Sequence, residues 1–297
     1  MSRVHYTFCP VCNSNRIHPL MTVKDYSVSG ETFPIWQCEA CSLRFTQDVP
    51  DENEISRYYK SDDYISHTNT NRGIVNQLYL HVRNITLRLK SNTIKKHTAR
   101  ATGAVLDVGA GTGAFLKHMQ EEGWAVTGIE PDAGARQVAR QTFGLDLQPF
   151  DRLRQLPKES FDAITLWHVL EHVHNLHDYM GFLKSLLKPG GKLFIAVPNY
   201  TSADAAIYRL AWAAYDVPRH LYHFSPQAIQ VLMERHGLRV PFQKPMWFDA
   251  FYISLLSSKY KNGTPSWMGA LSSGLRSNIT ALLSKERCSS LLYIISA

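Results

Sequence analysis

The stretch from Val105 to Gly113 constrains this chain more than any other, because it joins a short apolar segment directly to a glycine-rich loop, VLDVGAGTG. Helix-like sequence follows from Ala114 to Glu122, and a second apolar segment, Ala125 to Ile129, ends at Glu130. Glycines let a backbone approach a ligand closely, and an acid at the end of the second strand can accept hydrogen bonds from both ribose hydroxyls. The pattern predicts a nucleotide-type cofactor site at the carboxyl edge of a parallel sheet.

Two classes of cofactor fit this loop on local pattern alone. Gly109, Gly111 and Ala114 satisfy the looser dinucleotide pattern, and Glu130 lies 21 residues after Gly109, which suits a nicotinamide cofactor. Asp107 favours the other class, because a carboxylate there would repel a pyrophosphate but attract an amino group and a sulfonium cation. An incidental glycine loop in a doubly wound domain is the remaining interpretation, and it requires the ordered motifs downstream to be coincidental.

The downstream motifs come in one familiar order. They are Ser160 to Ile164, Trp167 to Val173 (WHVLEHV), the turn Leu187 to Gly191 (LKPGG), and Leu193 to Pro198. With the glycine loop and its acids, they resemble the class I S-adenosylmethionine-dependent methyltransferases, in the branch that holds quinone and sugar methyltransferases. The resemblance covers roughly residues 100 to 245. It implies an α/β fold with a Rossmann-like, doubly wound sheet of seven mostly parallel strands, and S-adenosyl-L-methionine as methyl donor.

The resemblance also implies where the cofactor would bind. Asp107 and the loop backbone would hold its methionine part, and Glu130 its ribose. Tyr64 is included because a tyrosine-bearing segment lies over the cofactor like a lid in related methyltransferases. The expected cofactor-binding residues are Asp107, Gly109, Ala110, Gly111, Thr112, Gly113, Glu130, Pro131, Trp167, His168 and Tyr64.

The segment Asp216 to Ser225 (DVPRHLYHFS) is the expected location of the catalytic base. It resembles a motif of sugar C-methyltransferases with zinc-bearing N-terminal modules, whose histidine before leucine acts as the general base or lies beside it. By position that residue is His220, and a histidine that only positions the substrate loop is the alternative. Arg219 replaces a residue that is commonly acidic there, which indicates an anionic group on the acceptor. His172 completes the catalytic candidates.

His168 and His172 are four residues apart, with Glu171 between them. On a helix the two imidazoles would share one face. Some similar quinone methyltransferases use a divalent ion near the matching Glu-His, so metal binding stays open here. Packing and hydrogen bonding beneath the sheet edge is the simpler interpretation of Glu171 and His172.

Four of the five cysteines form two C-x-x-C pairs separated by 25 residues, and they are Cys9, Cys12, Cys38 and Cys41. Each pair directs two thiolates at one tetrahedral ion, so the spacing predicts a structural Zn²⁺ in a ribbon. Disulfides or redox thiols are the alternative, which a cytoplasmic setting disfavours. Cys288 stands alone and is expected to be a buried apolar residue.

Three regions follow from these motifs: a zinc ribbon at 1–50, a helical lid and linker at 51–98, and the catalytic domain at 99–297 with a helical insertion at about 248–283. Periodicity predicts a long helix over 74–96. The predicted strands are 104–108, 125–130, 145–148, 162–167, 192–197, 238–244 and 289–296, and the predicted helices are 113–122, 132–142, 177–188 and 225–236.

The formal net charge is +7, from 32 basic and 25 acidic residues. This excess could suit nucleic acid, anionic lipid headgroups or phosphorylated substrates, but the cations are dispersed, as on an ordinary solvated surface. Met1 to Pro10 lacks an apolar signal region, and no apolar run approaches the roughly 20 residues of a membrane span. We therefore expect a cytoplasmic protein without a membrane span.

The predicted function is methyl transfer to a small-molecule acceptor with an anionic group, such as a nucleotide-linked or lipid-linked sugar or another envelope or secondary-metabolite intermediate. An RNA methyltransferase with a zinc-ribbon RNA-binding module is the alternative, although residues 9–41 hold only Arg16 and Lys24 as basic residues. A binding protein on an inactive methyltransferase fold is a third hypothesis. The intact Asp107, glycines and Glu130 disfavour it.

Overall fold

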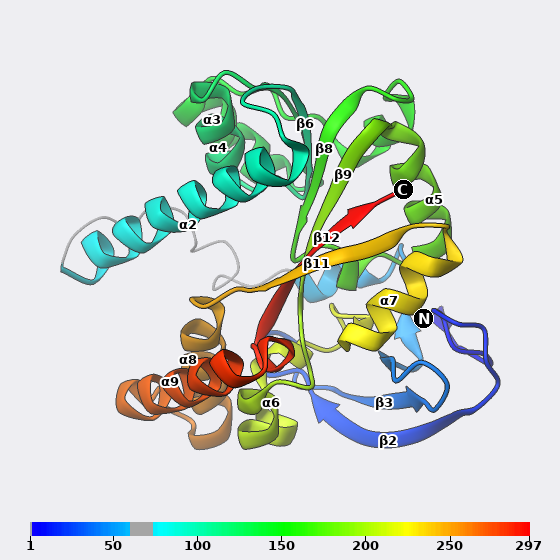
Figure 1. The fold of residues 1–297 in the computed structure, drawn as a ribbon. Helices are drawn as coiled ribbons and strands as arrows, with labels where there is room; N and C mark the ends of the chain where they lie inside the picture. The colour runs from blue at the N-terminus through cyan, green and yellow to red at the C-terminus, as the bar shows by residue number, and fades with distance from the viewer. Residues whose placement is uncertain (1, 60–73) are drawn as a thin grey trace.

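The computed structural model describes residues 2–59 and 74–297, with side chains from residue 82 onward in the second range. Its centre is a six-stranded sheet in the order β11-β12-β9-β8-β6-β7 (Figure 1). Four neighbouring strands run parallel, namely β7 (Ala125–Ile129), β6 (Ala104–Val108), β8 (Phe161–Trp167) and β9 (Leu187–Pro198). The strands β12 (Ser290–Ser296) and β11 (Arg239–Pro245) add an antiparallel edge. The predicted α/β fold with a mostly parallel sheet is confirmed.

The segment 145–148 differs from the prediction, because it makes only one parallel bridge, between Gln148 and Ile129, instead of a seventh full strand. Pro149 follows at once and has no backbone N–H to continue a ladder. The two leucines of the segment pack into the core, and this burial explains its strand-like apolar pattern.

Helices cover both faces of the sheet (Figure 1). One face carries α2 (Ile74–Thr98), α3 (Ala114–Glu121) and α4 (Ala133–Phe143), and the other carries α5 (Leu176–Leu186) and α7 (Pro226–Arg235). The side chains of Asp132 and Ser225 cap α4 and α7 by accepting a backbone N–H of the first turn, and Pro226 occupies the first helical position of α7. These caps fix where two of the predicted helices begin.

A second group of helices lies beyond the carboxyl end of β9, and it consists of α6 (Ala203–Tyr208), α8 (Asp249–Asn262) and α9 (Trp267–Leu283). The last two fill the segment 248–283, which was predicted to be mainly helical. Short 3₁₀ turns are η1 (Ile55–Tyr59), η2 (Phe150–Gln155), η3 (Leu170–His172), η4 (Arg209–Ala211), η5 (Ala213–Tyr215) and η6 (Lys285–Arg287). Within the described ranges, no helix has the length and apolar character needed to cross a membrane.

The N-terminal region forms two small antiparallel sheets. One pairs β1 (Arg3–Val4) with β5 (Val49–Pro50), and the other contains β2 (Ile17–Lys24), β3 (Thr32–Cys38) and β4 (Arg44–Thr46). The strand β10 (Tyr222–His223) joins this second sheet by pairing with β4. The proposed boundary near residue 50 therefore separates two parts of the chain that share a sheet and a core.

Candidate functional site

The glycine loop connects β6 to α3 at the carboxyl edge of the parallel strands. Gly109, Gly111 and Gly113 have φ values of 73°, 54° and 81°, a left-handed conformation that favours glycine. A Cβ on Gly109 would lie 2.4 Å from Cγ2 of Val169, so the loop passes close to the chain that leaves β8. At Gly111 an added Cβ would meet no atom within 4 Å, so the loop is open at that point.

Glu130 follows β7 and fastens this loop. Its Oε2 accepts the backbone N–H of Gly111 at 2.7 Å, and its Oε1 accepts that of Asp132 at 2.9 Å. Burial raises the pKa of the Glu130 carboxyl above its ordinary value, although these two hydrogen bonds oppose the rise. The loop and the acid after the second strand are thus joined by a hydrogen bond that the sequence does not predict.

Asp107 lies beside the loop and is 2% exposed. Its Oδ1 accepts the hydroxyl hydrogen of Thr165 at 2.6 Å. Burial raises the pKa of Asp107 to about 7, although Thr165 and the ammonium group of Lys90 oppose the rise. Lys90 comes from α2, and its Nζ lies 4.0 Å from the ring centroid of Trp167. A cation and an aromatic face therefore accompany the buried carboxylate.

His168 follows β8 and lies between two carboxylates. Its Nε2 is 3.0 Å from Oδ2 of Asp249, at the start of α8, and its Nδ1 is 3.5 Å from Oε1 of Glu171. Burial alone would lower the pKa of His168, but the two carboxylates outweigh it and raise the pKa to about 10. The ring is therefore an imidazolium at neutral pH.

Glu171, His172 and His220 bring three potential ligand atoms within 4.8 Å of one another. Glu171 is fully buried, and apart from the 3.5 Å ion pair with His168 its carboxylate oxygens accept no hydrogen bond from the described residues. Nδ1 of His172 lies 2.9 Å from the backbone oxygen of Arg219 and 3.0 Å from the hydroxyl of Tyr59. Burial, with a contribution from His220, lowers the pKa of His172 to about 4. Such a cluster can share a proton or hold a divalent cation.

His220 is held from two sides and is 8% exposed. Its Nδ1 lies 2.9 Å from the carbonyl oxygen of Ala214, which can only accept, so Nδ1 carries the proton of the neutral ring. Its Nε2 then keeps a lone pair, 3.9 Å from Oδ2 of Asp216. The backbone oxygen of His220 accepts the hydroxyl hydrogen of Thr46 in β4 at 2.7 Å. The N-terminal sheet thus supports the candidate base.

Arg219 is 2% exposed, and its donors are already engaged. It donates to both carboxylate oxygens of Asp216, to Oδ1 of Asp25 at 3.0 Å and to the backbone oxygen of Tyr58 at 2.8 Å. Two carboxylates neutralise this buried cation, so it has no free donor face for an anionic acceptor. The anion-binding role expected for Arg219 is not supported, and we interpret the residue as a link between the N-terminal sheet and the base-bearing loop.

Other predicted positions fall at the margin of this site. Pro131 is exposed, and its backbone oxygen accepts from Nη1 of Arg136 at 2.7 Å. Ala110 and Thr112 are half-buried in the glycine loop. Tyr64 lies outside the described residues. Lys90, Asp249 and Asp25 were not predicted, because their partners lie far away in the sequence and no local motif marks them.

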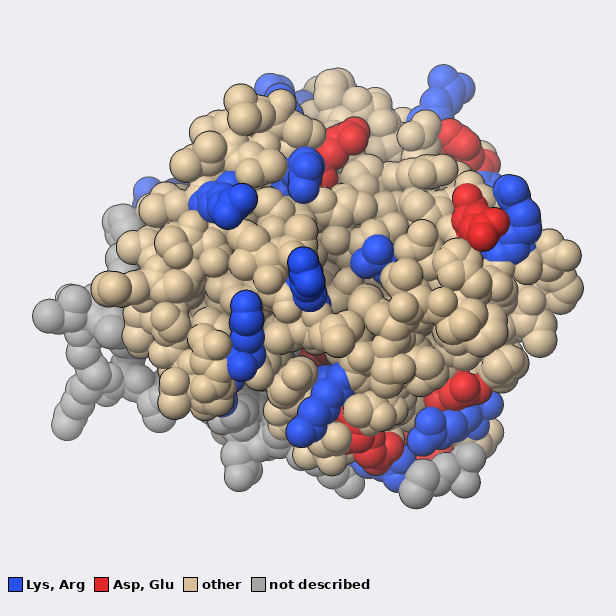
Figure 2. Space-filling model, turned by 90° about the horizontal axis from the view of Figure 1, so that it is seen from below, with Lys and Arg blue, Asp and Glu red and all other residues tan. Residues whose placement is uncertain are grey.

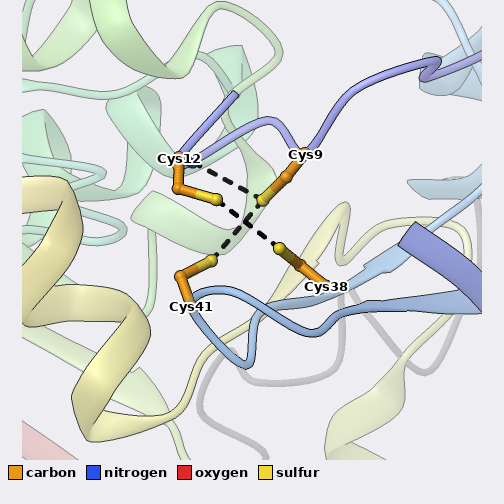
Figure 3. Close-up of side chains that lie close together, drawn as sticks. All are labelled: Cys9, Cys12, Cys38 and Cys41. Atoms are coloured by element: carbon orange, nitrogen blue, oxygen red, sulfur yellow. Dashed lines mark hydrogen bonds between the residues drawn. The ribbon is translucent and has the colours of Figure 1, made fainter. Parts of the chain in front are cut away.

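The four paired cysteines converge from two loops (Figure 3). Sγ of Cys9 lies 3.5 Å from that of Cys41, and Sγ of Cys12 lies 3.5 Å from that of Cys38. All four sulfurs lie within 4.8 Å of one another. These separations far exceed a disulfide bond of about 2.05 Å. They approach the roughly 3.8 Å edge of a tetrahedron whose metal–sulfur bonds are about 2.3 Å. The arrangement fits a four-thiolate metal site.

The residues after the two pairs, Asn13 and Ser42, both have left-handed φ values, of 58° and 60°. The N–H of each donates to the oxygen of the first cysteine of its pair, at 2.9 Å and 3.0 Å. The two loops therefore repeat one local geometry, which turns both thiols of each pair inward.

A family described as a methyltransferase domain matches residues 81–241, more than half of the chain. The ubiquinone biosynthesis O-methyltransferase of Nitrosococcus oceani is 30% identical over 166 residues, which cover 51% of this chain and 70% of that protein. The demethylmenaquinone methyltransferase of Tropheryma whipplei is 33% identical over 136 residues, or 44% of this chain and 57% of that protein.

Among solved structures, the 1,6-didemethyltoxoflavin-N1-methyltransferase of Burkholderia thailandensis covers 94% of this chain and 98% of its own, with a TM-score of 0.49 and 15% identity. The family match spans the glycine loop, both of its acids and the histidine cluster. With that match and the fold described above, this chain belongs to the class I S-adenosylmethionine-dependent methyltransferases.

Proposed function

We propose that this enzyme methylates a hydroxyl group of a small molecule, and that His220 removes the proton. Two curated relatives carry names that refer to ubiquinone biosynthesis and demethylmenaquinone, which supports a small acceptor. Nucleotide-linked or lipid-linked sugars and other envelope or secondary-metabolite intermediates are the acceptor classes that we propose. The observation that carries the proposal is the free Nε2 lone pair of His220, in a buried cluster joined through Glu171 to the chain beside the cofactor loop.

The cofactor supplies an electrophilic methyl group on a sulfonium. We assign its binding to Asp107 and the backbone of Gly109–Gly113 for the methionine part, and to Glu130 for the ribose. Trp167 and His168 would line the same pocket. The Lys90 ammonium neighbours Asp107 in the free protein, so a bound amino group or sulfonium would exchange one cation for another beside this carboxylate.

In the proposed reaction, the acceptor oxygen forms a bond to the methyl carbon while the methyl–sulfur bond breaks. The hydroxyl proton moves to Nε2 of His220, and the resulting imidazolium is stabilised by the Asp216 carboxylate 3.9 Å away. His172 remains neutral because its pKa is low, so it adds no competing positive charge. An assay of methyl transfer after chelator treatment, with and without added Mg²⁺, distinguishes two roles of the cluster. One is proton transfer by His220, and the other is metal binding by Glu171, His172 and His220.

The test of this function is formation of S-adenosylhomocysteine from S-adenosylmethionine with a panel of hydroxylated small molecules, beside total RNA. We expect turnover with members of the panel and none with RNA. His220→Gln should lower kcat by about a hundredfold or more, since general-base catalysis contributes that much, while binding of S-adenosylhomocysteine stays unchanged. His236→Gln, on the far end of α7, is the matched control. Transfer to RNA alone would refute the proposal.

Cofactor binding is expected to depend on pH through Asp107. Its pKa of about 7 means that the carboxyl is partly protonated at neutral pH in the free protein, and a cationic ligand favours the ionised form. Affinity for S-adenosylmethionine should therefore rise between pH 6 and pH 8 in calorimetric titrations. Asp107→Asn should bind more weakly and with a flat profile, whereas an unchanged slope in this variant would assign the titration to another group.

We also propose that the four cysteines bind one structural Zn²⁺. Four thiolates complete a tetrahedron and leave no position for substrate, so the ion would stabilise the N-terminal sheets instead of taking part in methyl transfer. Three of the four cysteines are buried, and Val11 and Leu43 pack beside them in the core shared with the catalytic domain. The ion would thus act on the site through the contacts from β4 to His220.

A further inference from the structure

Helix α9 (Trp267–Leu283) exposes a continuous row of large apolar side chains. Five of them recur at every fourth position, and two more lie beside the row. Their exposed fractions run from 47% at Leu275 to 88% at Leu283. The row consists of Trp267, Leu271, Leu275, Ile279 and Leu283, with Met268 and Leu282 beside it. Single exposed leucines are common on protein surfaces, but seven large apolar side chains on one face of one helix are not.

The orientation of α9 about its own axis is set by the residues on its opposite, buried face. Ala270, Gly274, Ser277 and Ala281 are buried there. A Cβ on Gly274 would lie 2.6 Å from Cδ1 of Phe251 in α8, so the two helices touch closely at this point. The hydroxyl of Ser277 also donates to the buried carboxylate of Asp204 in α6 at 2.9 Å. Small residues therefore face the protein, and the apolar row faces outward.

The charged residues between Asp249 and Glu286 are all basic. No Asp or Glu occurs from Ala250 to Lys285, while Lys259, Lys261, Arg276 and Lys285 lie in the same segment and are exposed. The face that includes α6, α8 and α9 is seen in Figure 2 as a broad uncharged area with isolated Lys and Arg, and Asp and Glu lie mostly toward its margins. The segment thus combines an apolar stripe on α9 with Arg276 on the same helix and with lysines at the end of α8 and after α9.

We propose that α9 is an interfacial helix that binds the surface of an anionic lipid bilayer. An amphipathic helix with such a stripe lies in the plane of the interface, and flanking Lys and Arg are attracted to anionic headgroups. Trp267 at its first turn suits the headgroup level. A second copy of this chain would bring the same cations against one another, which disfavours self-association through this row.

The apolar row on α9 is linked through α8 to the candidate site around His168. The helix α8 begins at Asp249, the partner of His168, and the side chain of Asn278 in α9 donates to the backbone oxygen of Trp247 at 3.0 Å. Binding of α9 to a bilayer would therefore also fix the position of α8, which carries Asp249. The binding itself needs no acceptor and no turnover, so it can fail or succeed independently of the proposed function.

The test is flotation of the full chain with vesicles of phosphatidylcholine alone or mixed with phosphatidylglycerol. We expect binding to the mixed vesicles that weakens with added salt. The triple variant Leu271→Ser, Leu275→Ser, Leu283→Ser should lower the partition coefficient about tenfold or more, because apolar burial at the interface is lost. Arg276→Glu with Lys285→Glu should lower binding to mixed vesicles only. Phe150→Ser with Phe242→Ser removes exposed apolar side chains elsewhere and is the control.

Unfolding temperature and S-adenosylhomocysteine affinity of each variant establish that the fold and the cofactor site are intact. Equal binding of the wild type and the triple variant to mixed vesicles would overturn the proposal. So would a wild-type dimer that becomes monomeric in the triple variant, together with an absence of vesicle binding, because the row would then be a self-association surface.

Discussion

Replacement of Glu130 by alanine is expected to weaken S-adenosylhomocysteine binding by about a hundredfold or more. The two proposed hydrogen bonds from the ribose hydroxyls to this carboxylate would be worth about 1.5–3 kcal/mol each, and the variant could form neither. The variant also loses the acceptor for the Gly111 N–H, which fastens the glycine loop to the end of β7 in the free protein. The loop would then have to be ordered by the ligand. Calorimetric titration of purified protein measures the change.

Glu121→Ala is the matched control, because this exposed carboxylate lies at the end of α3, close in sequence to the loop but on the helix surface. Glu130→Gln should fall between the wild type and Glu130→Ala, since an amide keeps one acceptor and loses the charge. Wild-type affinity in Glu130→Ala would mean that the ribose contacts another residue and that the motif assignment is wrong.

The sheet and its glycine loop could be predicted because their signals are local. Three glycines with left-handed φ, the acid after the second strand and the capping residues Asp132 and Ser225 each act within a few residues of the chain. The segment 145–148 shows the limit of this reading. Its apolar alternation indicates burial, but Pro149 ends its pairing after one bridge. Hydrophobic periodicity does not indicate how many residues of a segment pair with a neighbouring strand.

The electrostatics of the site could not be predicted, because they depend on pairs that are distant in sequence. Asp249 reaches His168 across 81 residues, and Asp25 reaches Arg219 across 194. Arg219 shows the consequence: a local pattern indicated a cation facing an acceptor, whereas burial between two carboxylates uses its donors inside the protein. Sequence separation hides such pairs, and only the packing of the N-terminal sheet on the base-bearing loop brings them together.

The largest effect on stability is expected from loss of the proposed zinc ion. Cys38→Ser should reduce the zinc content from one ion per chain to none and lower the free energy of unfolding by more than about 4 kcal/mol, because metal binding is coupled to folding. Catalysis should fall as well, since β4 begins six residues after Cys38 and holds the backbone of His220 through Thr46. Metal analysis, thermal unfolding and turnover are measured on the same preparation.

Cys288→Ser separates this effect from the loss of any buried thiol. Cys288 is fully buried like Cys38, but it is not one of the four cysteines whose sulfurs lie together, so its replacement should leave the zinc content at one. Because Asp25 and Thr46 connect the N-terminal sheets to Arg219 and His220, Cys38→Ser should lower kcat more than it weakens S-adenosylhomocysteine binding. The proposed cofactor-binding residues lie on or directly after β6, β7 and β8. A zinc-free wild type with full stability would refute the metal assignment. Equal losses of kcat and cofactor affinity would instead indicate that the N-terminal sheets support the whole domain, with no particular effect on the base-bearing loop.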